Sequence, residues 1–120
     1  MTTAPRTETR LRHVRKRLEA LLPELRAKAE ELAPRPGFLV EPVIETHTMI
    51  ELPDEEPVYE AVYVVVDGTD EERRAFDKAL GAFLWHLTRA DKDLFELTNL
   101  NVVSPKSMKL WRSIHARTST

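Results

Sequence analysis

The chain has 120 residues, of which 42% are hydrophobic and 32% are charged. This length and composition suit one globular domain with a modest core. The chain has no cysteine, which excludes a disulfide framework and a thiolate metal site. The sequence shows neither an apolar leader nor an apolar run long enough to span a membrane, so we expect a soluble, cytoplasmic protein with no membrane partner.

The formal net charge at pH 7 is -2, but the charges are segregated along the chain. Residues 1–17 hold six Lys or Arg and one Glu, whereas residues 38–72 hold eleven Asp or Glu and neither Lys nor Arg. A basic arm is typical of a protein with an anionic partner such as nucleic acid. The alternative is a solvated helix end whose charges balance the acidic middle within an assembly. The lack of aromatic residues between the arginines favours this alternative.

The first predicted element is a long helix over residues 7–33, preceded by an arm, residues 1–6, that we expect to be disordered. Pro23 lies inside the helix and predicts a kink. The apolar residues recur at steps of three and four, which is typical of one buried helix face. This face either covers the sheet of its own domain or associates with a second chain. Its residues are Leu11, Val14, Leu18, Leu21 and Leu25.

Two strands follow, and the turn predicted at residues 53–57 makes them an antiparallel hairpin. Residues 38–52 alternate between apolar and polar side chains, so we expect one buried face, one solvated face and a bulge or bend near Pro42. Residues 58–66 are apolar at both alternations. This pattern predicts a central strand that is covered on both faces.

The segment VYVVVDGTDEER, residues 62–73, joins this strand to the clearest helix, residues 70–89. Its Asp-Gly-Thr is similar to the turn in the first motif of haloacid dehalogenase-type phosphotransferases, but Val65 stands where that family has its nucleophilic Asp. A structural turn accounts for the same residues. Gly68 permits a sharp exit from the strand, and Thr69 and Glu72 have the Thr-x-x-Glu spacing of a capping box.

Residues 94–103 are predicted as a third strand, with the alternative that the segment DLFEL, residues 93–97, continues as helix. The last helix, residues 105–117, begins with Ser104 as N-cap and Pro105 at its first position. The element order is therefore α-β-β-α-β-α, with a β-β-α-β core over residues 38–103. We expect an α+β fold: one domain with a small three-stranded mixed sheet that contains the hairpin, and a long amphipathic first helix.

Candidate catalytic and metal-binding residues are sparse. Glu45, His47 and Glu51 share one strand face and are weak candidate metal ligands, although such a row is more typical of a solvated or interface surface. The sequence has no Gly-x-Ser-x-Gly elbow and no glycine-rich phosphate loop. A pocket between sheet and helices that uses Tyr59, Tyr63, His47 or His86 is the least favoured alternative. We therefore expect a protein without enzymatic activity, cofactor or metal.

The leading interpretation is a non-enzymatic protein–protein interaction or assembly module, a subunit of a homo- or hetero-oligomer such as a small component of a larger particle. Trp85 and Trp111 join the five apolar residues of the first helix as predicted interface residues, because aromatic side chains carry much of the energy of interfaces. The alternative is nucleic-acid binding through basic residues of the first and last helices. These are Arg6, Arg10, Arg12, Arg15, Lys16, Arg17, Lys106, Lys109 and Arg112.

Overall fold

The computed structural model describes residues 6–49 and 59–118, with side chains for residues 10–49 and 59–114. It confirms the predicted α+β fold with a three-stranded mixed sheet. The predictions for the N-terminal arm, for the turn at 53–57 and for the strand residues on either side of that turn lie outside the described residues. The elements are α1 (Arg6–Leu32), β1 (Leu39–Met49), β2 (Tyr59–Val66), α2 (Asp70–Thr88), α3 (Lys92–Leu97), β3 (Thr98–Val103) and α4 (Pro105–Thr118).

Strand β2 is the centre of the sheet, whose order is β1-β2-β3. It pairs antiparallel with β1, as the predicted hairpin requires, and parallel with β3. The parallel pairing is possible because α2 and α3 carry the chain back along the sheet. The register between β1 and β2 shifts between Leu39 and Ile44, which confirms the bulge predicted near Pro42. Residues 60–66 are all buried, as expected of a central strand.

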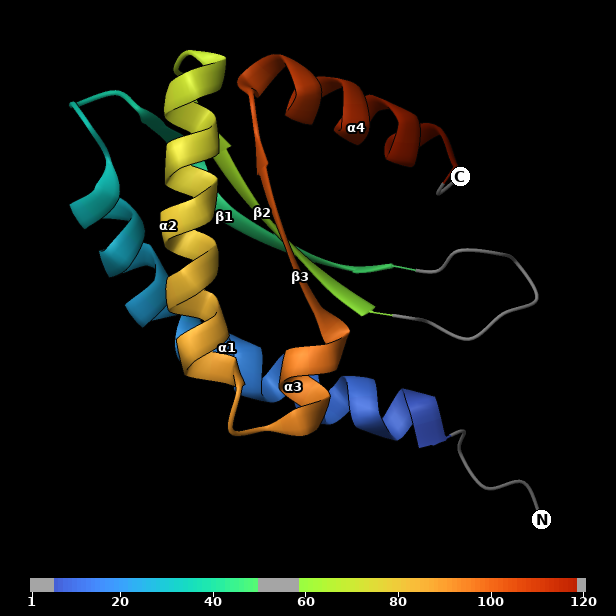
Figure 1. The fold of residues 1–120 in the computed structure, drawn as a ribbon. Helices are drawn as coiled ribbons and strands as arrows, with labels where there is room; N and C mark the ends of the chain where they lie inside the picture. Colours follow the sequence, from blue (N-terminus) through green and yellow to red (C-terminus); the bar gives the residue numbers. More distant parts are fainter. Residues whose placement is uncertain (1–5, 50–58, 119–120) are drawn as a thin grey trace.

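The sheet is covered on both faces, and each face has its own apolar cluster (Figure 1). Val62, Val64 and Val66 point to the face covered by α1, α2 and α3, where they meet the larger cluster. Ala61, Tyr63 and Val65 point to the opposite face, where Met108 of α4 completes a smaller cluster. The alternating apolar residues of β2 therefore serve two cores, which explains why both alternations are apolar.

Helix α1 continues through Pro23. Figure 1 shows that it changes direction between its blue first part, which passes α3, and its teal second part, which lies beside α2. Leu18 and Leu25 lie at 1% and 0% exposure within the larger cluster. Of the two alternatives for this apolar face, the structure shows the one in which the helix covers its own sheet.

The segment between α2 and β3 differs from the prediction, because residues 94–97 are helical and the strand begins only at Thr98. Asp91 acts as the N-cap of α3, and its Oδ1 accepts a hydrogen bond from the Leu94 amide at 3.2 Å. The helical turn places Leu94 in the larger cluster with 0% exposure. Capping and burial together outweigh the strand propensity of this apolar segment.

The face of β1 that carries Glu45 and His47 is partly covered, whereas the alternation predicted a solvated face. Their side chains are 19% and 36% exposed, because α4 returns over this side of the sheet after β3 (Figure 1). Alternation along a strand shows which residues share a face. It does not show which element, more than fifty residues later in the sequence, will cover that face.

The turn between β2 and α2 has the predicted capping box. Thr69 Oγ1 accepts from the Glu72 amide at 3.1 Å, and Glu72 Oε1 accepts from the Thr69 amide at 2.9 Å. The reason for glycine at position 68 differs from the prediction, since its backbone is not left-handed. A Cβ there would lie 2.7 Å from Cε1 of the buried Phe38. Glycine is needed because any side chain at this position would clash with the Phe38 ring.

Candidate interaction surfaces

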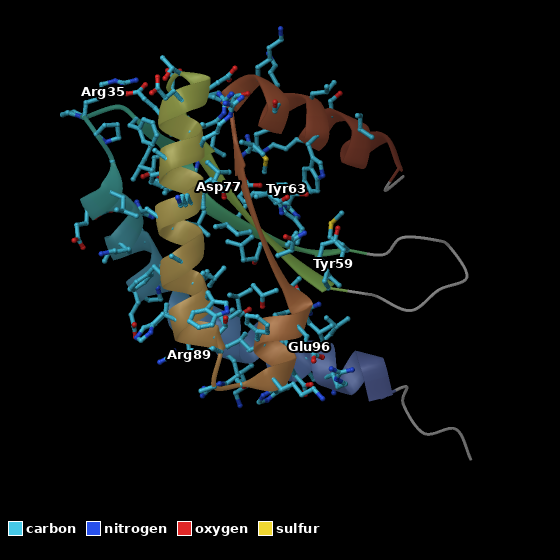
Figure 2. The ribbon with its side chains drawn as sticks, in the orientation of Figure 1. Arg35, Tyr59, Tyr63, Asp77, Arg89 and Glu96 are labelled. Atoms are coloured by element: carbon cyan, nitrogen blue, oxygen red, sulfur yellow. The ribbon has the colours of Figure 1, made fainter. Side chains whose placement is uncertain are left out.

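The joint between α4 and the sheet is an aromatic cluster of His47, Tyr63 and Trp111. The Trp111 ring centroid lies 4.5 Å from that of His47 and 4.9 Å from that of Tyr63. Burial raises the pKa of Tyr63, because it disfavours the phenolate. Figure 2 shows Tyr63 nearer to α4 than Tyr59, which lies at the start of β2. Trp111, predicted as an interface residue, is thus a partly buried contact within the chain.

An ionic pair borders the aromatic cluster. Arg112 donates to Glu45 Oε1, and His47 Nε2 lies 3.1 Å from Glu45 Oε2. Burial favours the protonated form of Glu45, but the hydrogen bonds from Arg112 and His47 outweigh it and hold the pKa of Glu45 below its ordinary value. Because these charges satisfy one another across the joint, they fix the position of α4 on the sheet.

The structure separates most of the residues predicted as weak candidates for a metal site or a pocket. Glu45 and His47 contact each other, whereas Glu51 lies outside the described residues. Within the described ranges, no group of three or more His, Cys, Asp or Glu is placed to hold a metal ion. Tyr59 and Tyr63 belong to the α4 side of the sheet, but His86 is exposed on α2, on the other side. The four pocket candidates therefore do not converge.

The opposite side of α4 is exposed and carries both apolar and basic side chains. Leu110 and Ile114 are 63% and 49% exposed and lie one helical turn apart. Lys106 and Lys109 are exposed beside them, and neither forms an ion pair among the side chains described. We call these four residues the outer face of α4. Sequence reasoning missed this face, because it gives Ile114 or His115 to one apolar side of the last helix together with Met108 and Trp111, whereas Ile114 is exposed in the structure.

The basic residues of α1 are largely paired within the chain. Arg10 contacts Asp93 Oδ1 through Nε at 3.0 Å and Nη2 at 2.8 Å. It also approaches Glu96 at 3.4 Å, which lies where α3 meets the first part of α1 (Figure 2). Arg15 contacts the buried Glu60 at 3.2 Å. Arg10 and Arg15 of α1 thus find their acidic partners in α3 and β2.

Asp91 is the centre of this network. His13 lies 3.1 Å and Arg17 lies 3.6 Å from its Oδ2. The hydrogen bond from the Leu94 amide lowers the pKa of Asp91 most, and His13 and Arg17 lower it further. One carboxylate therefore caps α3 and joins it to α1, and it engages Arg17 of the predicted nucleic-acid surface.

The remaining predicted interface residues fall into two groups. Trp85 is 50% exposed on α2, with the Arg89 guanidinium 5.2 Å from its ring centroid, and it stays available to a partner. The apolar residues of α1 have no comparable surface to offer, since most are at most 3% exposed and the remaining one is partly buried. They are Leu11, Val14, Leu18, Leu25 and, partly buried, Leu21.

A hollow of about 310 Å³ lies between the end of α1 and the first half of α2. Its wall is mostly apolar, with Glu72 at the rim. Glu72 is already paired, because Arg35 donates to it and, at 3.1 Å, to the Asp67 carbonyl. The other lining residues are Leu32, Pro34, Ala75, Phe76 and Ala79.

Comparison with models of protein families, with curated proteins and with solved structures finds no match to this chain. None of the helices in the described part of the chain is long and apolar enough to cross a membrane.

Proposed function

We propose that the chain is a non-enzymatic protein–protein interaction module that works as a subunit of an oligomer. The observation that carries the proposal is the outer face of α4, on which two large aliphatic side chains are 63% and 49% exposed next to two lysines that form no ion pair among the described side chains. Burial of Leu110 and Ile114 would supply binding energy, and the lysines would favour a partner surface with negative charge.

The arrangement of α4 supports an interaction role for its outer face. Met108 and Trp111 already anchor the helix to the sheet, so Leu110 and Ile114 are not needed for this packing. Single exposed apolar residues are common on protein surfaces. Two of them on one turn, flanked by cations, make a continuous surface that is typical of a binding site.

The test is the mass of the purified full chain in solution, measured by light scattering and by native mass spectrometry. We expect a mass that is a multiple of the 13.8 kDa of one chain, or a stable complex with a partner protein recovered by pulldown. A strict monomer that recovers no partner would sink the proposal.

Nucleic-acid binding is the second candidate, favoured by Lys16, Lys106 and Lys109, which are exposed and form no ion pair within the described part of the chain. Two observations weigh against it. Arg10, Arg15, Arg17 and Arg112 each contact a carboxylate, which leaves less positive charge for phosphates. Figure 1 also places the first part of α1 and helix α4 at opposite ends of the sheet, so they do not form one continuous surface.

A further inference from the structure

We propose that β3 pairs antiparallel with β3 of a second copy of this chain, which joins two three-stranded sheets into one six-stranded sheet. The pairing rests on the oligomer of the proposed function, and it uses a surface separate from the outer face of α4. The two copies would be related by a twofold axis perpendicular to the sheet. Both would contribute the same residues, as in the commonest class of soluble oligomers.

Strand β3 is a free edge, because it stands at one end of the sheet order β1-β2-β3 and pairs with β2 alone. Alternate backbone amides and carbonyls of an edge strand point away from the sheet and can pair with a further strand. Within residues 6–49 and 59–118, no backbone hydrogen bond from a turn, loop or cap reaches β3. In Figure 1, β3 is drawn in front of β1 and β2, and no described element lies in front of it. The edge is therefore open to a second strand.

The two edges of the sheet differ in the features that block such pairing. Strand β1, the other edge, contains the charged Glu41 and has Pro42 within a register shift. Charge, proline and bulges each disfavour pairing between sheet edges. Strand β3, with the sequence TNLNVV, has neither proline nor charge. Its register with β2 runs without a shift from Thr98 to Val103. Only the edge at β3 is thus built like a strand that expects a neighbour.

This difference favours a second copy over a strand from another protein. When two copies pair through β3, the joined sheet ends in β1 on both sides. Both edges that remain then carry Glu41, Pro42 and the register shift, so the assembly stops at a dimer. A foreign strand would cover β3 but would place its own outer edge at the end of the sheet.

The pairing would also bury more of β3. None of its residues is buried and Asn99 is exposed, whereas residues 60–66 of the central strand are all buried. Leu100 and Val102 face α1 and α2, where they pack against the larger cluster but stay partly exposed. A twofold axis perpendicular to the sheet keeps each side chain on its own face. The Leu100 and Val102 side chains of both copies would therefore meet on one face and shield one another from water.

The structure has room for a second strand beside β3. A second hollow, of about 330 Å³, lies between the first half of α2 and Val102. Arg74 and Asp77 line it and are exposed, and Figure 2 shows Asp77 on the side of α2 toward β3. Phe76 and Leu80 pack the buried side of α2, so this hollow opens at the edge of the sheet. An added strand would meet open space there, and no packed helix has to move.

The experiment compares the wild type with two double variants of the full chain and with their mixture, by native mass spectrometry and analytical ultracentrifugation. Asn99→Lys with Asn101→Lys places like charges near the twofold axis, on the α4 side of the joined sheet. Asn99→Glu with Asn101→Glu does the same with negative charge. We expect each double variant alone to self-associate at least about tenfold more weakly than the wild type. Mixed together, the two should form a one-to-one dimer, because lysines then face glutamates.

Controls separate the pairing from loss of folding and from a general effect of charge. Ala75→Lys with Ala82→Lys adds the same charge at exposed positions of α2 and should leave assembly unchanged. Circular dichroism should show every variant folded. If a double variant unfolds, amide hydrogen exchange of the wild type gives a second measurement. Exchange in residues 98–103 should slow as the protein concentration rises, and exchange in β1 should not.

The outcomes distinguish this pairing from the proposed function. A wild-type oligomer that the lysine variant leaves intact, or double variants that do not pair with each other, overturns the pairing but not the interaction role. Exchange in residues 98–103 that does not depend on concentration also overturns it. A wild-type monomer overturns the pairing, and recovery of a different protein partner would then preserve the interaction role alone.

Discussion

The ring centroid of Trp111 on α4 lies 4.5 Å from that of His47 on β1. This contact covers a strand face that the alternation of β1 marks as solvated. It also orients α4: with Met108 and Trp111 against the sheet, Leu110 lies on the far side of the helix and Ile114 at its flank, and both are exposed. The candidate interaction surface is therefore a consequence of how one indole ring is packed.

Replacing Trp111 by alanine should destabilise the protein by about 2–3 kcal/mol, somewhat less than for a fully buried aromatic residue, because the ring is only partly buried. Trp85→Ala is the matched control, since Trp85 is 50% exposed, and it should cost about 0.5 kcal/mol. Urea unfolding followed by far-UV circular dichroism measures both without relying on tryptophan fluorescence. Equal losses in the two variants would contradict the role given to Trp111.

The contribution of Glu45 to stability should depend on pH. Its pKa is lowered in the folded state, so the carboxylate stabilises the fold above the unfolded pKa, near 4.5. This contribution is lost as the pH falls through the lower folded pKa. Glu45→Gln should therefore be less stable than the wild type at neutral pH. The difference in stability should narrow as the pH falls below the ordinary pKa of a glutamate.

Glu24→Gln is the control for this titration, because Glu24 is exposed on α1 and forms no ion pair among the described residues. The difference in stability between Glu24→Gln and the wild type should stay small both at neutral pH and in acid. Urea midpoints at a series of pH values give both comparisons. A Glu45→Gln gap that stays constant or widens toward low pH would show that the hydrogen bonds from Arg112 and His47 do not hold the carboxylate ionised.

Replacing each of two glycines by alanine should change the stability of the protein in opposite directions. At Gly68 the new Cβ would lie 2.7 Å from Phe38 Cε1 and 2.9 Å from Glu72 Oε1, so Gly68→Ala should cost about 2 kcal/mol through displaced core and cap groups. At Gly81, inside α2, the nearest atom is Leu100 Cδ2 at 3.9 Å. Gly81→Ala should therefore stabilise the protein by about 0.5–1 kcal/mol. Thermal and urea unfolding measure the change in stability of each variant. If both variants are stabilised, or both destabilised, the space around each Cβ does not determine the effect.

The contact between Arg15 and Glu60 should matter more than its position on the helix surface suggests. Glu60 is 2% exposed, and Arg15 and Thr48 both donate to its Oε1. Arg15→Met leaves this carboxylate with fewer partners and should cost about 2–3 kcal/mol, less than for a fully buried pair because Arg15 is half exposed. Arg17→Met, whose partner is 3.6 Å away, should cost about 0.5 kcal/mol. A double-mutant cycle with Glu60→Gln measures the coupling directly.

Nucleic-acid binding can be tested by fluorescence anisotropy with duplex and single-stranded DNA at two salt concentrations. We expect no measurable binding at physiological salt, because four of the predicted phosphate-binding arginines are engaged with carboxylates. If the alternative function is correct, affinity will fall with salt by a log–log slope of about -0.9 per phosphate contact on duplex DNA. The double variant Lys106→Gln and Lys109→Gln should then reduce that slope, whereas Lys78→Gln should not.

Sequence reasoning predicted best the features that depend on neighbours along the chain. The capping box of Thr69 and Glu72, the bulge near Pro42 and the doubly covered β2 follow from local backbone chemistry and from alternation. It was wrong where a capped turn competed with strand propensity, at residues 94–97. It also gave the wrong reason for Gly68, because the crowding by Phe38 comes from a residue thirty positions earlier.

The sequence by itself determined which side chains share a face of each helix and strand, because the periods of 3.6 and 2 are properties of the backbone. Only the tertiary structure decided what covers each face. It assigned Arg10, Arg15 and Arg17 of α1 to Asp93, Glu60 and Asp91. It also placed α4 on Glu45 and His47, and left Leu110 and Ile114 outside. Pairings between distant segments depend on how whole elements pack together, and no local pattern of residues encodes that choice.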